Sequence, residues 1–251
     1  MSEVRIIGLE GIPEVRAGDD VPAMIVAAGR QTGVAIEDGD VLVVTQKVVS
    51  KAEGRIVDLA GITPSPFAEA YAAEFEKDPR QIEVVLWESR RIVRQQHGVM
   101  ICETRHGFVC ANAGVDASNV EKTGTVCLLP VDPDASVRGI RDAIKRELGV
   151  TVAVIMSDTF GRPWREGHVN FAIGIAGIAP VIDYAGQVDP AGYELRVTQM
   201  AVVDELAAAA ELVHGKLARV PVAIVRGTEY TASEDAATSM LIRPAEKDLF
   251  R

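Results

Sequence analysis

Three short apolar runs constrain the fold more than any other feature of the sequence. They span residues 41–44, 150–156 and 220–225, and each is rich in β-branched residues without a polar interruption. This pattern is typical of buried strands, and each run leads directly into polar or basic residues. Because strands and helices alternate irregularly along the rest of the chain and hairpins are expected, the sequence predicts a mixed α+β fold rather than a doubly wound sheet.

Helical and hairpin patterns fill the intervening segments. Ser136 is expected to cap one helix, and Gly149 to end it. A short strand is expected over 4–9 and a Gly-spaced strand over 170–178. We also expect helices over 65–75, 78–95, 136–148 and 198–217, and a hairpin formed by 99–102 and 107–110.

Composition and charge narrow the class of protein. The chain has 251 residues with no internal repeat or linker, so we predict one compact unit over 1–251, with room for two subdomains. A formal net charge of −10 argues against a nucleic-acid partner and against an anionic membrane. A protein this acidic that handles phosphates needs clustered cations at the site, which makes local groups of basic residues informative.

The cysteines and the N-terminus indicate a cytoplasmic protein. Cys102, Cys110 and Cys127 form no CxxC pair, so we expect reduced, buried thiols rather than a disulfide or metal framework. No apolar run approaches the roughly 20 residues of a membrane span. The first residues carry no signal-peptide pattern.

The segment 157–167 follows the second apolar run, and we expect it to form a loop. The carboxylate of Asp158 and the hydroxyls beside it suit a hard cation such as Mg²⁺ or Mn²⁺. Arg162 and Arg165 suit a phosphate or carboxylate, which guanidinium binds in a bidentate way. The alternative is a capped loop with a surface ion pair.

Two further polar segments carry the same kind of chemistry. Lys47 and Lys51 follow the first apolar run, and this arrangement is typical of a strand-to-helix junction that binds an anion. The alternative is that both lysines lie on a solvent-exposed face of a helix. The loop 112–119 offers four oxygen-bearing side chains, and Asx turns are its alternative explanation. Together with Asp158, Asp116 of this loop would supply a second carboxylate for a metal–nucleotide site.

The combined pattern predicts a metal–nucleotide site that lacks the usual nucleotide-binding motifs. Asp116 and Asp158 would hold divalent cations, and Lys51, Arg162 or Arg165 would neutralise phosphates. The sequence contains no Walker motif, no GxGxxG, no GxSxG and no HExxH. A hydrolytic zinc site therefore has no support.

Four segments carry a family resemblance. Residues 42–55, 112–119, 157–167 and 225–227 resemble, in the same order, the motifs of the coenzyme F420-0:γ-glutamyl ligase family. The likeness covers nearly the whole chain, so 1–251 corresponds to the single-module form of this ligase domain.

The resemblance implies an activity. Such ligases use GTP to add L-glutamate to the carboxylate of coenzyme F420-0 through an acyl phosphate, and then add further glutamates in γ-linkage. They require Mg²⁺ or Mn²⁺ and are stimulated by a monovalent cation such as K⁺. Their fold is α+β, and they assemble as an intertwined homodimer.

The resemblance also implies residue roles. The metal ligands would be Asp116, Asp158, Thr159 and Glu229. The nucleotide contacts would be Ile12, Pro13, Glu14, Val15, Gln46, Lys47, Lys51, Asn119, Gly227 and Thr228. Independently of the resemblance, local chemistry makes Arg162, Arg165 and Glu166 the candidate catalytic residues, and Glu166 and His168 are the candidates for a general base.

Three other functions compete with the ligase. The first is an amide ligase with a different acceptor, because acceptor specificity lies in the shape of the pocket. The second is a non-catalytic nucleotide-binding dimer, which loss of a carboxylate or lysine would favour; Asp116, Asp158 and Lys51 are all present. The third is a metal-dependent phosphohydrolase, which would release phosphate without glutamate.

Overall fold

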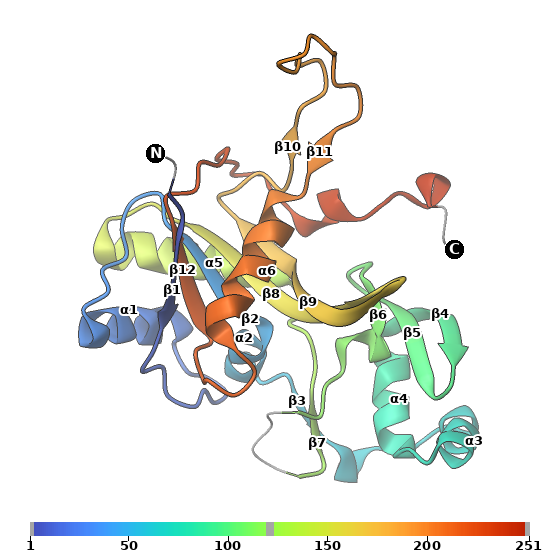
Figure 1. The fold of residues 1–251 in the computed structure, drawn as a ribbon. Coiled ribbons are helices and arrows are strands. Elements are labelled where there is room, and N and C mark those ends of the chain that lie inside the picture. The colour runs from blue at the N-terminus through green and yellow to red at the C-terminus, as the bar shows by residue number, and fades with distance from the viewer. Residues whose placement is uncertain (1–2, 119–122, 249–251) are drawn as a thin grey trace.

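A five-stranded mixed sheet forms the centre of the molecule. The computed structural model describes residues 3–118 and 123–248. In spatial order the strands are β1 (Arg5–Leu9), β12 (Val222–Arg226), β2 (Val41–Thr45), β8 (Ala153–Arg162) and β9 (Arg165–Ala176) (Figure 1). β2 and β8 are parallel, and the other neighbours are antiparallel. This confirms the mixed α+β prediction and places all three apolar runs in one sheet.

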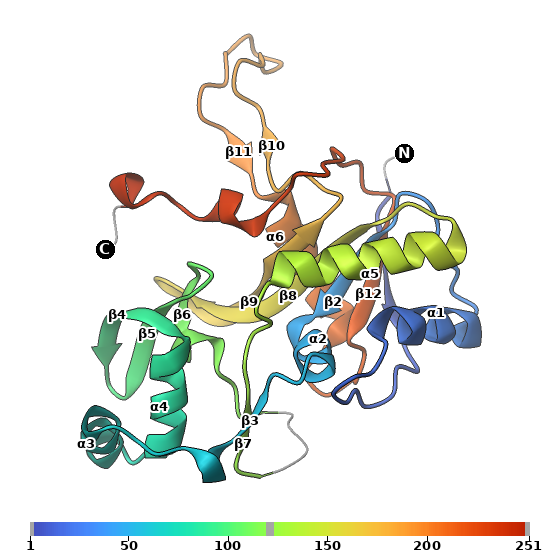
Figure 2. The same cartoon turned by 180° about the vertical axis from the view of Figure 1, so that it is seen from behind.

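Helices cover both faces of this sheet, as Figures 1 and 2 show. The long helices are α1 (Val21–Thr32), α5 (Pro133–Leu148) and α6 (Val202–His214), and the short α2 (Gln46–Ala52) follows β2. Val43 and Ile155 pack with α6 in one core, whereas Leu42 and Val154 pack with α1 and α5 in another. Since alternate residues of a strand point to opposite faces, a strand covered on both sides needs an uninterrupted apolar run.

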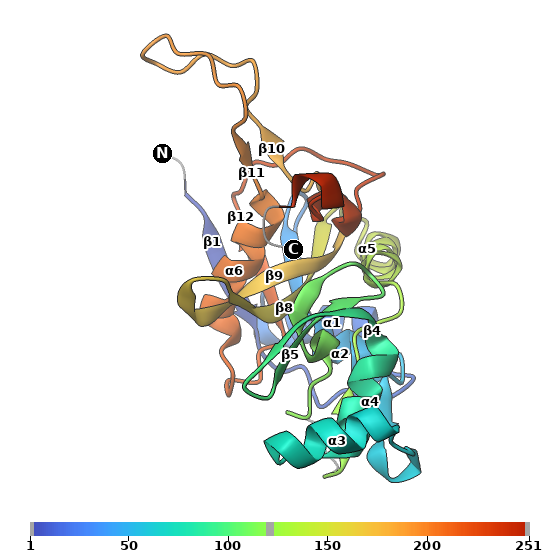
Figure 3. The ribbon, with the colours of Figure 1, turned by 90° about the vertical axis from the view of Figure 1, so that its right-hand side faces the viewer.

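A smaller unit with its own core lies beside the central sheet (Figure 3). It contains α3 (Pro66–Phe75), α4 (Pro79–Glu88), β4 (Ser89–Gln96), β5 (Val99–Thr104) and β6 (Val109–Ala111), with the 3₁₀ turns η1 (Leu59–Gly61) and η2 (Asn112–Gly114) at its ends. The pair β3 (Ile56–Asp58) and β7 (Thr125–Cys127) connects it to the rest of the chain. The strands β5 and β6 pair as the predicted hairpin.

Two C-terminal features extend from this body. The strands β10 (Ile182–Asp183) and β11 (Gln199–Met200) form the base of an arm that projects away from the sheet (Figure 1). The tail after β12 carries the short turns η3 (Thr238–Leu241) and η4 (Ala245–Lys247). Within the residues described, no helix has the length and apolar character to cross a membrane.

Most predicted helices are present, but one predicted cap is wrong. Ser65 caps α3, accepting a hydrogen bond from the amide of Ala68. α5 begins earlier than predicted, and its cap is Asp132, whose carboxylate accepts from the amide of Ala135 at 2.9 Å. Ser136 instead lies inside the first turn, where its hydroxyl donates to the carbonyl of Asp132.

The predicted helix over 78–95 is wrong in its second half, and that over 198–217 is too long. Residues after Glu88 form β4, which pairs with β5, and Arg91 contacts Glu103 across the two strands at 2.8 Å. The start of the second segment pairs as β11 with β10, so α6 begins only at Val202. In both segments, pairing with a distant strand overrides local helix preference.

The expectation of a loop over 157–167 is also wrong. β8 continues to Arg162, and β9 begins at Arg165, so most of the segment forms two paired strands. Trp164, with φ of 59°, forms the turn between them. Phe160 and Phe171 stack across the strands with ring centroids 5.8 Å apart. Asp158 therefore sits on a rigid strand, which fixes the direction of its carboxylate.

Candidate functional site

The candidate site lies where β2 ends and its parallel pairing with β8 stops, while β8 itself continues to Arg162. Thr45 and Ser157 occupy the same register position on these neighbouring strands. Helix α2 begins directly after Thr45, and Asp158 directly follows Ser157. In open sheets, ligands bind outside the carboxyl ends of strands, so this edge is the expected place for a site.

A lysine and a carboxylate from distant segments meet at this edge. The ammonium of Lys47 on α2 lies 2.6 Å from Oδ2 of Asp116 and 2.8 Å from Oγ of Ser118. Burial alone would raise the pKa of Asp116, but hydrogen bonds from Lys47 and from the amide of Ser118 outweigh it and lower the pKa. Lys47 is thus not simply on a solvated helix face, and Asp116 is held ionised.

Asp158 is the most perturbed carboxyl group of the site. Burial raises its pKa from an ordinary value of 3.8 to about 6, and the nearby charge of Asp116 acts in the same direction. The amide of Thr159 and the charges of Lys47 and Lys216 oppose the rise without cancelling it. A buried carboxylate beside another carboxylate is a place where added positive charge is strongly favoured.

A second polar cluster lies around Thr159. Its hydroxyl accepts a hydrogen bond from Nζ of Lys216 at 2.5 Å and donates to Oδ1 of Asn170 at 2.7 Å. Nδ2 of Asn170 in turn donates to Glu211 on α6 at 2.8 Å. No sequence motif identified Lys216, Asn170 and Glu211 as residues of the site. The basic loop that precedes the third apolar run was the available signal for Lys216.

The predicted nucleotide-contacting turn lies against α2. Lys51 forms an ion pair with Glu14, which ties the turn 12–15 to the helix. Val15 is buried in the core of the α1 and α5 face, where Ile12 also packs. Gln46 is buried and accepts a hydrogen bond from Ser50 at 2.7 Å. The turn and the first residues after β2 therefore lie together, and their contact with a nucleotide stays a prediction.

The three predicted catalytic residues lie at the tip of the β8–β9 hairpin. Arg162 donates to the backbone carbonyl of Glu166 at 2.9 Å, while the side chains of Arg165 and Glu166 are exposed. Arg162 follows Asp158 by four residues, about 13 Å along a strand. The structure thus does not bring these residues together with the carboxylates.

Gly227, Thr228 and Glu229 lie at the opposite end of the sheet. Because β12 is antiparallel to β2, Val225 pairs with Val41 at the start of β2. The loop after β12 therefore lies at the opposite end of the strands from Asp158. The loop before β12, which contains Lys216, lies at the end near Asp158 instead. Asn119 lies outside the described residues.

Comparison with known proteins decides the family. The family model described as F420-0:Gamma-glutamyl ligase matches residues 11–227. The chain is 46% identical over 250 residues to the coenzyme F420:L-glutamate ligase of Methanothermobacter thermautotrophicus, covering 99% of both chains. The chain belongs to the F420-0:gamma-glutamyl ligase family. Its identity to the enzymes of the same name from Methanopyrus kandleri and Methanocaldococcus jannaschii is 42% and 40%, over 97% or more of each chain.

A divalent cation fits the oxygen atoms of this ligase-family site. Asp116 and Asp158 provide carboxylates, which are hard oxygen donors of the kind that Mg²⁺ and Mn²⁺ prefer, whereas Thr159 follows Asp158 on the strand and its hydroxyl lies on the other face, bound to Lys216 and Asn170. Burial raises the pKa of Asp158, so a cation beside it would favour the ionised carboxylate. Among residues 3–118 and 123–248, no three His, Cys, Asp or Glu side chains cluster as a metal group, so phosphate and water oxygens would complete the coordination.

The cysteines of this family member are structural. Cys102, Cys110 and Cys127 are all free and buried, as predicted. Burial raises the pKa of the Cys110 thiol to about 12, so it stays protonated and unreactive.

Proposed function

We propose that this chain is a GTP-dependent ligase that joins L-glutamate to coenzyme F420-0 and releases GDP and phosphate. Membership of the F420-0:gamma-glutamyl ligase family, with relatives of matching length, supports the ligase activity and its acceptor. The proposal adds GTP as the nucleotide, Mg²⁺ or Mn²⁺ as the divalent ion, and K⁺ as a stimulating cation.

One observation carries the proposal. Lys47, Asp116 and Asp158 come from three separate segments of the chain, and their charges perturb one another at one edge of the sheet. Joining an anionic carboxylate to an anionic phosphate requires positive charge between them, which Lys47 and a divalent cation held by the two carboxylates would supply. A protein with net charge −10 would otherwise repel both substrates.

The chemistry follows in two steps. A carboxylate oxygen of F420-0 attacks the γ-phosphorus of GTP, and GDP leaves, which produces an acyl phosphate. The amine of L-glutamate then attacks the acyl carbon, phosphate leaves, and the nitrogen loses a proton to give the amide. The second step depends mainly on holding the amine against the activated carbonyl.

The side chains have distinct roles in these steps. Lys47 is held at the strand end by Asp116 and Ser118, and Lys216 is held by Thr159, so both ammonium groups are oriented before substrate arrives. They offset the charge that accumulates on the transferring phosphoryl group. A divalent cation bound by Asp116 and Asp158 would add to this neutralisation and orient the phosphates.

The proposal includes a homodimer. The arm between β10 and β11 extends from the body and exposes apolar side chains, with Val188, Tyr193 and Val197 being 65%, 64% and 89% exposed. Exposed apolar side chains gathered on an extension are typical of a contact surface. A second copy that receives the arm would bury them.

The experiment is a reaction of the purified chain with F420-0, L-glutamate, GTP and Mn²⁺, followed by mass spectrometry. We expect a product heavier by one or more glutamyl units, and none from Asp158→Ala with an unchanged circular dichroism spectrum. Consumption of GTP without glutamyl transfer would leave a phosphohydrolase and overturn the ligase proposal. A second set without K⁺ or with ATP tests the cation and the nucleotide.

A further inference from the structure

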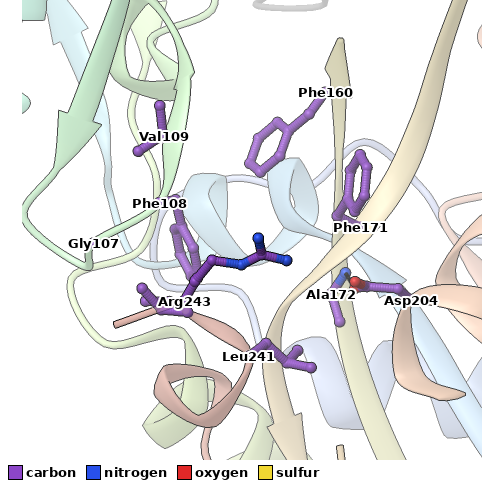
Figure 4. Close-up of a pocket in the computed structure, with 10 residues that line it drawn as sticks. Gly107, Phe108, Val109, Phe160, Phe171, Ala172, Asp204, Leu241 and Arg243 are labelled. Atoms are coloured by element: carbon purple, nitrogen blue, oxygen red, sulfur yellow. Dashed lines mark hydrogen bonds between the residues drawn. The ribbon is translucent and has the colours of Figure 1, made fainter. Parts of the chain in front are cut away.

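We propose that an aromatic cavity beside the candidate site holds the deazaflavin ring of the acceptor. The cavity has a volume of about 250 Å³ and lies between the β8–β9 hairpin, the turn before β6 and the C-terminal tail. This inference rests on the proposed function, because it assigns a place to the acceptor of that reaction. Figure 4 shows the side chains that line the cavity.

Three half-buried rings dominate the lining. Phe160 and Phe171 stack at 5.8 Å with their planes 25° apart, and Phe108 lines the cavity from the turn before β6. Arg243 of the tail extends among these rings (Figure 4). Flat faces with an adjacent guanidinium suit a planar aromatic ring that carries oxygen atoms on its edge.

Two of the rings that line the cavity, Phe160 and Phe171, lie on the same face of the sheet as Asp158. Phe171 pairs directly across from Asp158, and Phe160 follows Asp158 by two residues on the same strand. Side chains two apart on a strand, or directly opposite on its neighbour, share a face and lie about 5–7 Å apart. A ring in the cavity would therefore place the rest of the acceptor beside the carboxylate pair.

The size of the cavity suits part of a ligand. Pockets that hold a complete small molecule have about 300–1,000 Å³, so this one accommodates a ring system and leaves the side chain outside. Coenzyme F420-0 has this division, since its deazaflavin ring is joined to the reacting carboxylate by a flexible ribityl and phospholactyl chain. That chain would run from the cavity to Asp158.

The strand order separates the acceptor from the nucleotide. Lys51 and the turn 12–15 lie beside α2, which follows β2. The cavity lies along β9, and β8 with Asp158 stands between β2 and β9. Two substrates that approach from the two sides would meet at Asp158, which is the geometry that phosphoryl transfer between them needs. This favours the deazaflavin over the guanine base as the ring in the cavity.

The tail closes the cavity on its third side. Ile242 packs so tightly on the turn before β6 that a Cβ on Gly107 would lie 2.9 Å from its Cδ1, and Gly107 has φ of +95°. Leu241 and Arg243 flank this contact and line the cavity. The C-terminal residues thus contribute to the acceptor site although they follow the last strand of the sheet.

The test compares two substitutions at one ring position with a matched control. Acceptor binding is followed by the intrinsic fluorescence of F420-0 without nucleotide, and KM is measured for each substrate. For Phe171→Leu we expect Kd and KM for F420-0 to rise about three- to tenfold, because an apolar side chain remains but the stacking face is lost. Both values should stay unchanged in Phe171→Tyr, which keeps the aromatic ring. They should also stay unchanged in Phe67→Leu, which removes a half-exposed ring on α3, away from the cavity.

The outcomes separate the two proposals. If Phe171→Leu is folded and keeps the wild-type Kd and KM for F420-0, or if only its KM for GTP rises, the inference is wrong while the ligase function stands. If the wild-type chain adds no glutamate to F420-0, the proposed function itself fails. Should Phe171→Leu not fold, Arg243→Gln replaces it, with a rise in Kd for F420-0 as the supporting result and an unchanged Kd as the contrary one.

Discussion

The carboxyl group of Asp158 gives the sharpest prediction. Burial raises its pKa from 3.8 to about 6, and a difference of about two pKa units makes the ionised group cost the folded state about 3 kcal/mol. The amide side chain of Asp158→Asn carries no charge and still offers an oxygen to the backbone N–H of Thr159. We therefore expect the variant to be inactive but more stable than the wild type by about 3 kcal/mol at pH 7.5, measured by urea unfolding without metal.

The pH dependence fixes the sign of this effect. Above pH 6 the wild-type group is ionised in both the folded and unfolded states, so the full cost is present. As the pH falls through 6 the folded state takes up the proton first, and below 3.8 the group is neutral in both states. The stability difference between variant and wild type should therefore shrink between pH 7 and pH 4.

A control and a metal titration complete the experiment. The pKa of Asp78 is lowered, chiefly by its hydrogen bond with Arg80, so Asp78→Asn should lose stability at pH 7.5 and lose less as the pH falls. Mn²⁺ should stabilise the wild type and not Asp158→Asn, because a ligand stabilises only the state that binds it. An Asp158→Asn protein that is no more stable than the wild type at pH 7.5 would refute the reasoning.

Three further predictions follow from the arrangement of charges and surfaces. Lys216→Met should lower kcat by about 10²- to 10³-fold, whereas Arg165→Met at the exposed hairpin tip should lower it less than about fivefold. Steady-state kinetics measures both values, and a larger loss for Arg165→Met than for Lys216→Met would contradict the assignment of Lys216 to the site. Arg226 pairs with the buried Asp40 at 2.7 Å, so Arg226→Met should lower the free energy of unfolding in urea by about 3–5 kcal/mol. Its kcat at low temperature should stay unchanged. A variant as stable as the wild type would contradict this prediction. Val197→Asp should halve the molar mass found by light scattering without lowering the melting temperature, and an unchanged mass would argue against an arm-mediated dimer.

The chemistry of the site could be predicted from sequence because its residues follow apolar runs. Lys47 follows β2 and Asp158 lies at the corresponding place on β8, so parallel pairing of the two strands brings them to one edge. Asp116 joins them through its contact with Lys47, which local sequence does not encode. Its placement depends on pairing with Cys127, about ten residues away along the chain.

The direction of β12 could not be predicted from its composition. The loop after the third apolar run was expected at the site by analogy with the other two runs. Since β12 runs antiparallel to β2, the loop before it reaches the site, and Lys216 replaces Glu229 there. An apolar run predicts that a strand is buried, but it does not predict whether the strand is parallel or antiparallel to its neighbours.

Long-range pairing explains the remaining differences. Residues after Glu88 carry apolar and basic residues that fit a helix as well as a strand, and β5 decides between them. The segment after Asp158 contains glycine and proline typical of a loop, yet stacking of Phe160 on Phe171 extends both strands to the turn at Trp164. Cross-strand contacts of this kind are invisible to a local pattern.

The most direct test of the account follows one oxygen atom. F420-0 labelled with ¹⁸O in its carboxylate is incubated with the chain, L-glutamate, GTP and Mn²⁺, and the released phosphate is analysed by mass spectrometry. An acyl phosphate formed at the site of Lys47, Asp116 and Asp158 requires one ¹⁸O atom in each phosphate for each amide formed. Phosphate without ¹⁸O, alongside newly formed amide, would contradict the account.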